Sequence, residues 1–227
     1  LGIDAVWLMG VWTTGELGRQ LALDHPGMMD EYRKALPDVT PEDVVGSPYA
    51  VQEYRVATPL GGGHALRSLR MRLARRGIGL ILDYVCNHTA QDHKWVRQHP
   101  EYYINTEATA GAPPMQDAFA VTTSQGERWI AHGRDPMFPK WTDTAQLNPR
   151  SKAAREAMIA QLTKVAGMCD GVRCDMAMLL LSDVFARTWG TLGMPAGEDL
   201  ADGEFWKEAI EAVKVSKPDF LFIAEAY

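Results

Sequence analysis

Three acidic side chains each stand at the end of a short apolar run of the sequence: Asp83, Asp175 and Glu225. A carboxylate can attack a carbon centre, and a carboxylic acid can protonate a leaving oxygen. Cleavage of a glycosidic bond needs one group of each kind. If the runs are parallel strands, their carboxyl ends meet at one edge of a sheet, where the active sites of barrel enzymes lie. These strand ends are therefore the candidate active site.

The neighbours of Asp175 and Glu225 suggest which carboxyl group would be the nucleophile and which the general acid. Arg173 precedes Asp175 by two residues, so both side chains point to the same side of a strand. A guanidinium at this spacing favours the ionised carboxylate, which suits a nucleophile. Glu225 follows five apolar residues and has no basic neighbour in sequence. We expect this setting to raise its pKa, as a general acid requires.

Each of these residues also has an ordinary structural interpretation. An acidic residue at a strand end often caps a loop or forms a salt bridge, and an arginine two residues from an aspartate is commonly structural. A lone histidine such as His88 is more often a hydrogen-bonded core residue than a catalytic one. Three polar strand ends in one chain favour an active site, but their spacing alone does not name the reaction.

Four apolar runs would position these groups: 3–9, 79–85, 171–174 and 220–224. They show little polar alternation, which is typical of strands buried on both faces. Helical patterns separate them, so we expect a parallel sheet built from βα units.

Three helices are predicted between the strands. The first has leucines at helical spacing and ends at Gly77. The second begins at Asn148-Pro149, a capping residue followed by proline at the first helical position. The third covers 204–215 and ends before Pro218.

Two long segments remain, 10–63 and 89–148, of 54 and 60 residues. Segments of this length in a compact domain are usually functional or carry a small subdomain. The rest of the chain supplies about four of the eight units of a (β/α)8 barrel, which uses about 250 residues. The predicted fold is therefore α/β, an incomplete (β/α)8 TIM barrel over 1–227 with a small subdomain, 89–148, inserted within it.

Composition and charge argue against several other classes of protein. The net charge of −6 argues against nucleic acid as a partner, and no apolar run reaches the length of about 18 residues that a membrane span requires. The three cysteines lie in or beside apolar runs without a CxxC pair, which indicates reduced core thiols and a cytoplasmic location. The arginine-rich stretch 67–76 is interpreted as a solvated helix face. The chain begins without Met inside a predicted strand, so we expect its natural N-terminus to lie upstream.

The polar strand ends also resemble a known family. Asp83, Asn87 and His88 fit the first signature of the α-amylase superfamily (glycoside hydrolase family 13), Asp-x-x-x-Asn-His, and Asp175 ends its second, Gly-x-Arg-x-Asp. Glu225 resembles the glutamate at the end of the fifth barrel strand. Further segments are similar to the family in the same order: 1–9, 47–49, 60–62, 99–103 and 147–148. The resemblance covers nearly the whole chain and implies barrel strands two to five, with the insertion after strand three.

This resemblance implies a role for each matching residue, in a retaining α-glycosidase acting on α-glucosides or α-glucans by double displacement. Asp175 would be the nucleophile and Glu225 the acid/base. The substrate-binding residues would be Arg173, which orients Asp175; His88, which binds a sugar hydroxyl; Tyr49, which stacks on the sugar; and Asp83, which holds Arg173. Asn87 would brace the insertion. The partner would be an oligo- or polysaccharide, and we expect no cofactor.

The sequence departs from the family in two respects. The fourth signature, a His-Asp pair on strand seven, has no counterpart, so we expect a truncated domain that is close to inactive alone and unstable or self-associating through open strand edges. The oligomeric state of the intact protein is left open. Asp175 is followed by Met176 rather than the Lys-His pair associated with calcium, and Asn87 alone cannot supply the six to eight oxygens that calcium needs. We therefore do not favour a calcium site.

Alternative functions remain open at this point. A transglycosylase or glucanotransferase of the same superfamily would differ only in whether sugar or water takes the glycosyl group. A carbohydrate-binding relative that has lost catalysis would usually lack the nucleophile or the acid, and both are present. A nucleotide-binding α/β fold is disfavoured because the only glycine cluster, at 61–63, lacks the GxGxxG spacing.

Overall fold

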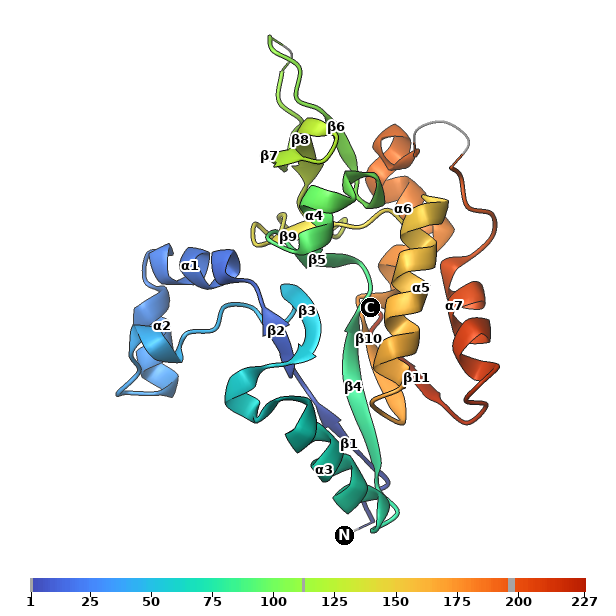
Figure 1. Cartoon of the computed structure of the whole chain (residues 1–227). Helices are drawn as coiled ribbons and strands as arrows, with labels where there is room; N and C mark the ends of the chain where they lie inside the picture. The colour runs from blue at the N-terminus through green and yellow to red at the C-terminus, as the bar shows by residue number, and fades with distance from the viewer. Residues whose placement is uncertain (1, 112, 196–198) are drawn as a thin grey trace.

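The computed structural model describes residues 2–111, 113–195 and 199–227. Its centre is a sheet of four parallel strands in the order β1-β4-β10-β11 (Figure 1). These are β1 (Ala5–Leu8), β4 (Gly79–Val85), β10 (Gly171–Asp175) and β11 (Leu221–Ala224). Three of them lie within the runs predicted from the sequence, and β10 extends one residue beyond its run, to Asp175. Within the described residues the sheet does not close into a barrel, and β1 and β11 form its edges.

Three helices follow strands of the sheet: α3 (Gly62–Ala74), α5 (Lys152–Ala166) and α7 (Phe205–Lys214). On each strand, every second side chain points toward these helices. These side chains are buried, among them Leu80, Leu82 and Val172. They pack in one core with Met158 and Leu162 of α5. Apolar burial on this face is the main force that holds the strands against the helices.

Two helix ends show how local sequence sets the boundaries. At the end of α3, Gly77 adopts φ 69°, and Ile78 N–H donates to Leu73 O, which closes the turn as predicted. The predicted start of α5 at Asn148-Pro149 is wrong. Ser151 is the N-cap and accepts from Ala154 N–H, whereas the Asn148 side chain closes a turn by accepting from Arg150 N–H.

The opposite face of the sheet carries the polar strand ends above a layer of apolar side chains. The register places Arg173 beside Asp83 on β4 and beside Ile223 on β11. Further down, Gly171 lies between Ile81 and Leu221; a Cβ added there would sit 2.7 Å from each of these side chains. The glycine of the Gly-x-Arg-x-Asp pattern is therefore required by close packing within the sheet face.

The first long segment is structured rather than a loop. It contains β2 (Trp12–Thr14) paired antiparallel with β3 (Val51–Val56), and a helical hairpin made of α1 (Glu16–Asp24) and α2 (Met28–Ala35). Two short 3₁₀ turns, η1 (Pro41–Asp43) and η2 (Thr58–Leu60), complete it. The hairpin projects to the left of the sheet in Figure 1. Arg19 fastens it by donating to Val44 O and Pro41 O.

The second long segment lies at the top of Figure 1 and carries two small sheets. β5 (His88–Ala90) pairs with β9 (Thr144–Gln146), and β8 (Gly126–Ala131) lies between β6 (Asn105–Glu107) and β7 (Ala118–Thr123). α4 (Lys94–Gln98) and η3 (Pro100–Tyr102) pack beside them. The β5-β9 pair joins the two ends of the segment, so its arrangement is fixed at the edge of the candidate site. Between β10 and α7 lie η4 (Ala177–Leu180), α6 (Ser182–Trp189) and η5 (Gly190–Gly193).

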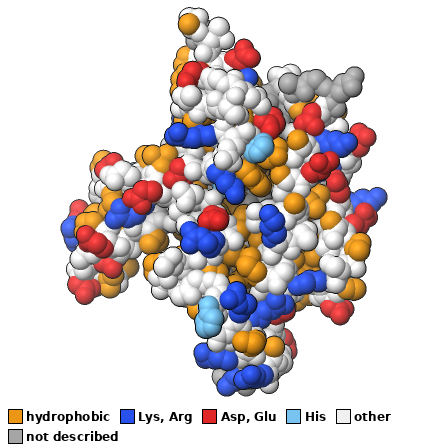
Figure 2. All heavy atoms as spheres, in the orientation of Figure 1, with side chains coloured by type: hydrophobic (Ala, Val, Ile, Leu, Met, Phe, Trp, Pro, Cys, Tyr) orange, Lys and Arg blue, Asp and Glu red, His pale blue; other side chains and the backbone are white. Residues whose placement is uncertain are grey.

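Other sequence expectations concern the surface and the thiols. All three cysteines are buried and free. Basic side chains gather over α3 at the lower end of Figure 2, and one of them, Arg70, forms an ion pair with Asp170 at 2.6 Å. None of the helices in the described ranges is long and apolar enough to cross a membrane.

Candidate active site

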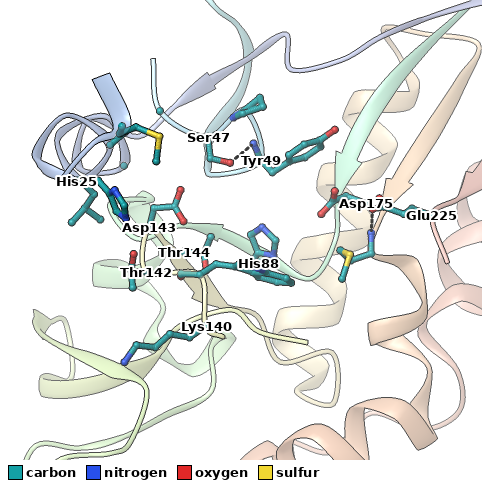
Figure 3. Close-up of a pocket in the computed structure, with 18 of the residues that line it drawn as sticks. His25, Ser47, Tyr49, His88, Lys140, Thr142, Asp143, Thr144, Asp175 and Glu225 are labelled. Atoms are coloured by element: carbon teal, nitrogen blue, oxygen red, sulfur yellow. Dashed lines mark hydrogen bonds between the residues drawn. The ribbon is translucent and has the colours of Figure 1, made fainter. Parts of the chain in front are cut away.

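A cavity of about 820 Å³ opens above the carboxyl ends of β4, β10 and β11. Figure 3 shows Asp175 and Glu225 at one side of it, with Tyr49 and His88 beside them. The α1–α2 hairpin and residues 140–144 of the second long segment line the remainder. Its volume falls within the range of about 300–1,000 Å³ typical of small-molecule sites.

Arg173 is the centre of the polar cluster at this end of the cavity. Its Nη1 donates to Asp175 Oδ1 at 2.7 Å, and its Nη2 lies 2.6 Å from Glu225 Oε1. Asp83 Oδ1 lies 3.5 Å from Nη1. The guanidinium also faces the rings of Trp7 and Tyr49, at 5.4 and 5.1 Å from their centroids. One cation thus holds three carboxylates from three neighbouring strands, and two aromatic rings limit its movement.

Asp175 is buried, and this burial dominates its protonation. Desolvation raises its pKa from 3.8 to about 7, although the Arg173 guanidinium and its hydrogen bond act in the opposite direction. The expectation that Arg173 would make ionisation easy is therefore incomplete, because the sequence does not reveal how deeply the strand end is covered. The Asp175 carbonyl accepts from the buried Cys86 thiol at 3.0 Å, which fixes the backbone below the carboxyl group.

Glu225 is one-third exposed and faces the cavity. Glu225 has no basic neighbour in sequence, but Arg173 contacts it from the adjacent strand. Its other oxygen accepts from Met176 N–H at 2.9 Å. Met176 has φ 48°, an uncommon conformation for a residue other than glycine. That turn after β10 directs the N–H toward Glu225.

Asp83 links the cluster to the segment that follows β1. It accepts from Gly10 N–H at 2.9 Å and from Trp7 Nε1 at 3.2 Å. Burial raises its pKa, whereas the hydrogen bond from Gly10 and the charge of Arg173 lower it. Trp7 was not singled out from the sequence; its place in an apolar strand gave no sign that its indole N–H would reach a site residue.

Tyr49 reaches the same cavity from the first long segment, and His88 reaches it from the start of β5. Burial lowers the pKa of His88 to about 4, so its ring is neutral near pH 7. The ring lies against Trp141, with 5.0 Å between centroids. Asn87 lies behind the cavity and bonds to Gln146 of β9, donating from Nδ2 to Gln146 Oε1 at 3.1 Å. Five of the seven predicted site residues thus line one cavity. Asp83 is buried behind Arg173, and Asn87 lies at the base of the second long segment.

Within the ranges that the structure describes, no three His, Cys, Asp or Glu residues gather in a way that could hold a metal ion. The cavity groups are a guanidinium, carboxylates and aromatic rings, a set suited to sugar hydroxyls and sugar ring faces.

The family profile of the alpha amylase catalytic domain matches residues 1–227. The chain belongs to the alpha-amylase family. The sequence resemblance to this family is thereby confirmed. No curated protein matches the chain in a sequence search.

Several solved structures share the fold of this family member. An alpha-amylase from Lactobacillus plantarum has a TM-score of 0.61 at 23% identity, covering 98% of this chain and 37% of that chain. A noncanonic maltogenic alpha-amylase from Thermotoga neapolitana has a TM-score of 0.58 at 21% identity, covering 99% and 38%. A debranching enzyme from Nostoc punctiforme has a TM-score of 0.54 at 16% identity, covering 100% and 36%. The chain therefore spans less than two fifths of the length of these enzymes, and the likeness establishes the α/β fold.

Proposed function

We propose that this chain carries the catalytic pair of a retaining α-glycosidase acting on α-glucosides or α-glucans. The observation that supports it most is the ion-pair cluster in which Arg173 contacts both Asp175 and Glu225 at the wall of one cavity. Retention requires two carboxyl groups only about 5–5.5 Å apart, and two groups that share one guanidinium suit that requirement. In this proposal the four parallel strands are strands two to five of a (β/α)8 barrel.

The proposed reaction has two displacements. Asp175 Oδ attacks the anomeric carbon as the glycosidic C–O bond breaks, and Glu225 gives its proton to the leaving oxygen. Glu225 then takes a proton from water, whose oxygen attacks the same carbon and releases Asp175. Each displacement inverts the anomeric carbon, so the product keeps the α configuration.

The protonation states must be set for the first step. Asp175 has to be ionised and Glu225 protonated, and the cluster holds three carboxylates around one cation. Because burial raises the pKa of Asp175 to about 7, the attacking form is gained as the pH rises through this value. Arg173 stabilises that form directly by donating to Oδ1.

The surrounding residues would hold the sugar. Tyr49 would stack against its apolar face, and the neutral His88 ring would bond to one hydroxyl. Asp83 would hold Arg173 and the backbone after β1 through its bond to Gly10. Asn87 would brace the second long segment through Gln146. Three side chains on this sheet face, Trp7, Leu221 and Ile223, are each about half exposed. Because water reaches this face, we expect slow turnover by residues 1–227 alone.

A mechanism-based label tests the nucleophile without fast turnover. Residues 1–227 would be incubated with a fluorinated α-glucosyl fluoride, and the protein digested and analysed by mass spectrometry. The expected result is one glycosyl adduct on Asp175, absent from Asp175→Asn and retained in the surface control Asp183→Asn. An adduct on another residue, or none after prolonged incubation, would contradict the proposal. With the unmodified substrate, NMR should show the α product first, and added acceptor sugars would reveal transglycosylation.

A further inference from the structure

We propose that the side-chain amide of Gln146 takes the place of a bound cation at the base of the second long segment and, through Asn87, fixes the proton of the His88 ring. The proposal rests on hydrogen bonds among buried groups and does not depend on the proposed reaction. It predicts that this junction needs no metal ion and that the neutral His88 ring carries its proton on Nε2.

The junction is the place where β9 returns beside β5. In Figure 1 this strand pair lies between the central sheet and the small sheet at the top. Gln146 is the last residue of β9, and Asn87 directly precedes β5. Their exposed fractions are 0% and 1%, so the polar atoms of both side chains need partners within the protein.

Three carbonyl oxygens converge on the amide nitrogen of Gln146. Nε2 lies 2.9 Å from the backbone oxygen of Asn87, 3.0 Å from Asn87 Oδ1 and 2.9 Å from the backbone oxygen of Leu147. Oxygens gathered in this way repel one another, and they are the ligands that a hard cation such as Ca²⁺ prefers. The NH2 group directs its two hydrogens at them. It therefore supplies positive charge density at the centre without the cost of burying an ion.

The backbone decides which way this amide points. The main-chain carbonyls of Asn87 and Leu147 can only accept hydrogen bonds, so the Gln146 atom next to them must be Nε2 and not Oε1. Gln146 Oε1 then accepts from Asn87 Nδ2 at 3.1 Å. The two side-chain amides are thus paired head to tail, and turning either one over would place oxygen against oxygen.

His88 is the last member of this chain of contacts. Its Nδ1 lies 3.3 Å from Asn87 Nδ2, which has a second hydrogen and can only donate. Nδ1 is therefore the acceptor, and the proton of the neutral ring is on Nε2. Burial lowers the pKa of His88 to about 4, in agreement with a neutral ring near pH 7. Because His88 lines the cavity, Gln146 is a positioning residue for the candidate active site.

Two substitutions of Gln146 test the comparison with a cation. Gln146→Glu keeps the shape of the side chain but replaces the central donor by an anionic acceptor, so the junction then presents only oxygens to one another, as a calcium site does. Gln146→Met keeps the length of the side chain but offers neither a donor nor a carboxylate. Gln98→Glu makes the same change of charge at an exposed position and serves as the control.

Thermal unfolding of residues 1–227 would be followed by circular dichroism near pH 8, in EDTA and in calcium chloride. We expect calcium to leave the melting temperature of the wild type and of Gln98→Glu unchanged. Both Gln146 variants should melt about 5 °C or more below the wild type in EDTA, because buried carbonyls lose their donor. Calcium should restore at least half of this loss in Gln146→Glu and none of it in Gln146→Met.

Nitrogen-15 NMR of the His88 ring tests the contact with Asn87. In the wild type the proton should be on Nε2. In Gln146→Met, where nothing holds the Asn87 amide in one orientation, the ring should show a mixture of its two neutral tautomers. A residue that only filled space at position 146 would leave the tautomer unchanged.

Four results would overturn the proposal. They are a wild-type His88 proton on Nδ1, a melting temperature or a His88 tautomer that is unchanged in Gln146→Met, no recovery of Gln146→Glu in calcium, and a calcium gain in the wild type equal to that in Gln146→Glu. If the Gln146 variants do not fold, the wild-type measurements still decide, because they need no substitution. None of these results bears on the adduct at Asp175, so the two proposals can fail separately.

Discussion

Arg173 on β10 and Glu225 beyond β11 form an ion pair of 2.6 Å, and the same guanidinium donates to Asp175 at 2.7 Å. The two candidate catalytic groups are thus electrostatically coupled through one residue. Glu225 raises the pKa of Asp175 by repulsion, and Arg173 lowers it by attraction. A substitution of Arg173 or Glu225 should therefore change the pKa of Asp175.

Asp175→Asn should stabilise the fold, and more so at alkaline pH. The pKa of Asp175 is raised in the folded chain, so the folded state holds the proton more tightly, and this contribution to stability is lost as the pH rises from 3.8 through about 7. Asparagine keeps an acceptor for Arg173 but carries no buried charge. We expect a gain in unfolding free energy of about 1–3 kcal/mol near pH 8 and little change near pH 4. Urea denaturation at both pH values measures it, and a gain that is independent of pH would refute the linkage.

Arg173→Gln and Glu225→Gln should shift the pKa of Asp175 in opposite directions. The first removes the cation that favours the carboxylate, so the pKa should rise above about 7; the second removes a repelling charge, so it should fall. Carbon-13 NMR of the aspartate carboxyl groups reports both. The exposed change Asp183→Asn serves as control. Shifts of the same sign in both variants would show that Arg173 and Glu225 do not act on Asp175 as opposite charges.

His88 should remain neutral throughout the range in which an ordinary histidine titrates. Burial lowers its pKa from 6.5 to about 4, so its contribution to stability is present at neutral pH and is lost as the pH falls from 6.5 toward 4. Nitrogen-15 NMR of the imidazole should therefore show no protonation of His88 at pH 5.5. Protonation of His88 near pH 6.5 would contradict its burial.

Two glycines should respond oppositely to replacement by alanine. At Gly171 a Cβ would lie 2.9 Å from Leu221 O and 2.7 Å from two side chains, so Gly171→Ala should cost about 1–3 kcal/mol. Gly18 lies within α1, where the nearest atom would be 3.4 Å away. Gly18→Ala should be neutral or stabilising by up to about 1 kcal/mol. Chemical denaturation checks both, and a tolerated Gly171→Ala would show that β10 and β11 can separate locally.

The sequence by itself determined the strands, the long helices and the polar strand ends. Apolar runs buried on both faces predicted β4 to the residue, and Gly77 predicted the end of α3, because both depend on local pattern and local backbone conformation. The start of α5 was missed since Asn148 and Ser151 are both good caps, and only packing decides which one is used. The family could be predicted from the sequence because its motifs are short runs of residues that are adjacent in the chain.

The tertiary structure alone decided how the site groups act on one another. Glu225 has no basic residue near it in sequence, yet the pairing of β10 with β11 brings Arg173 against it. Asp175 is desolvated by elements from several parts of the chain, which no residue beside it reveals. Trp7 carried no signal in sequence, because its contact with Asp83 depends on the pairing of β1 with β4. Distance and burial are properties of the folded chain, and they set the electrostatics of this site.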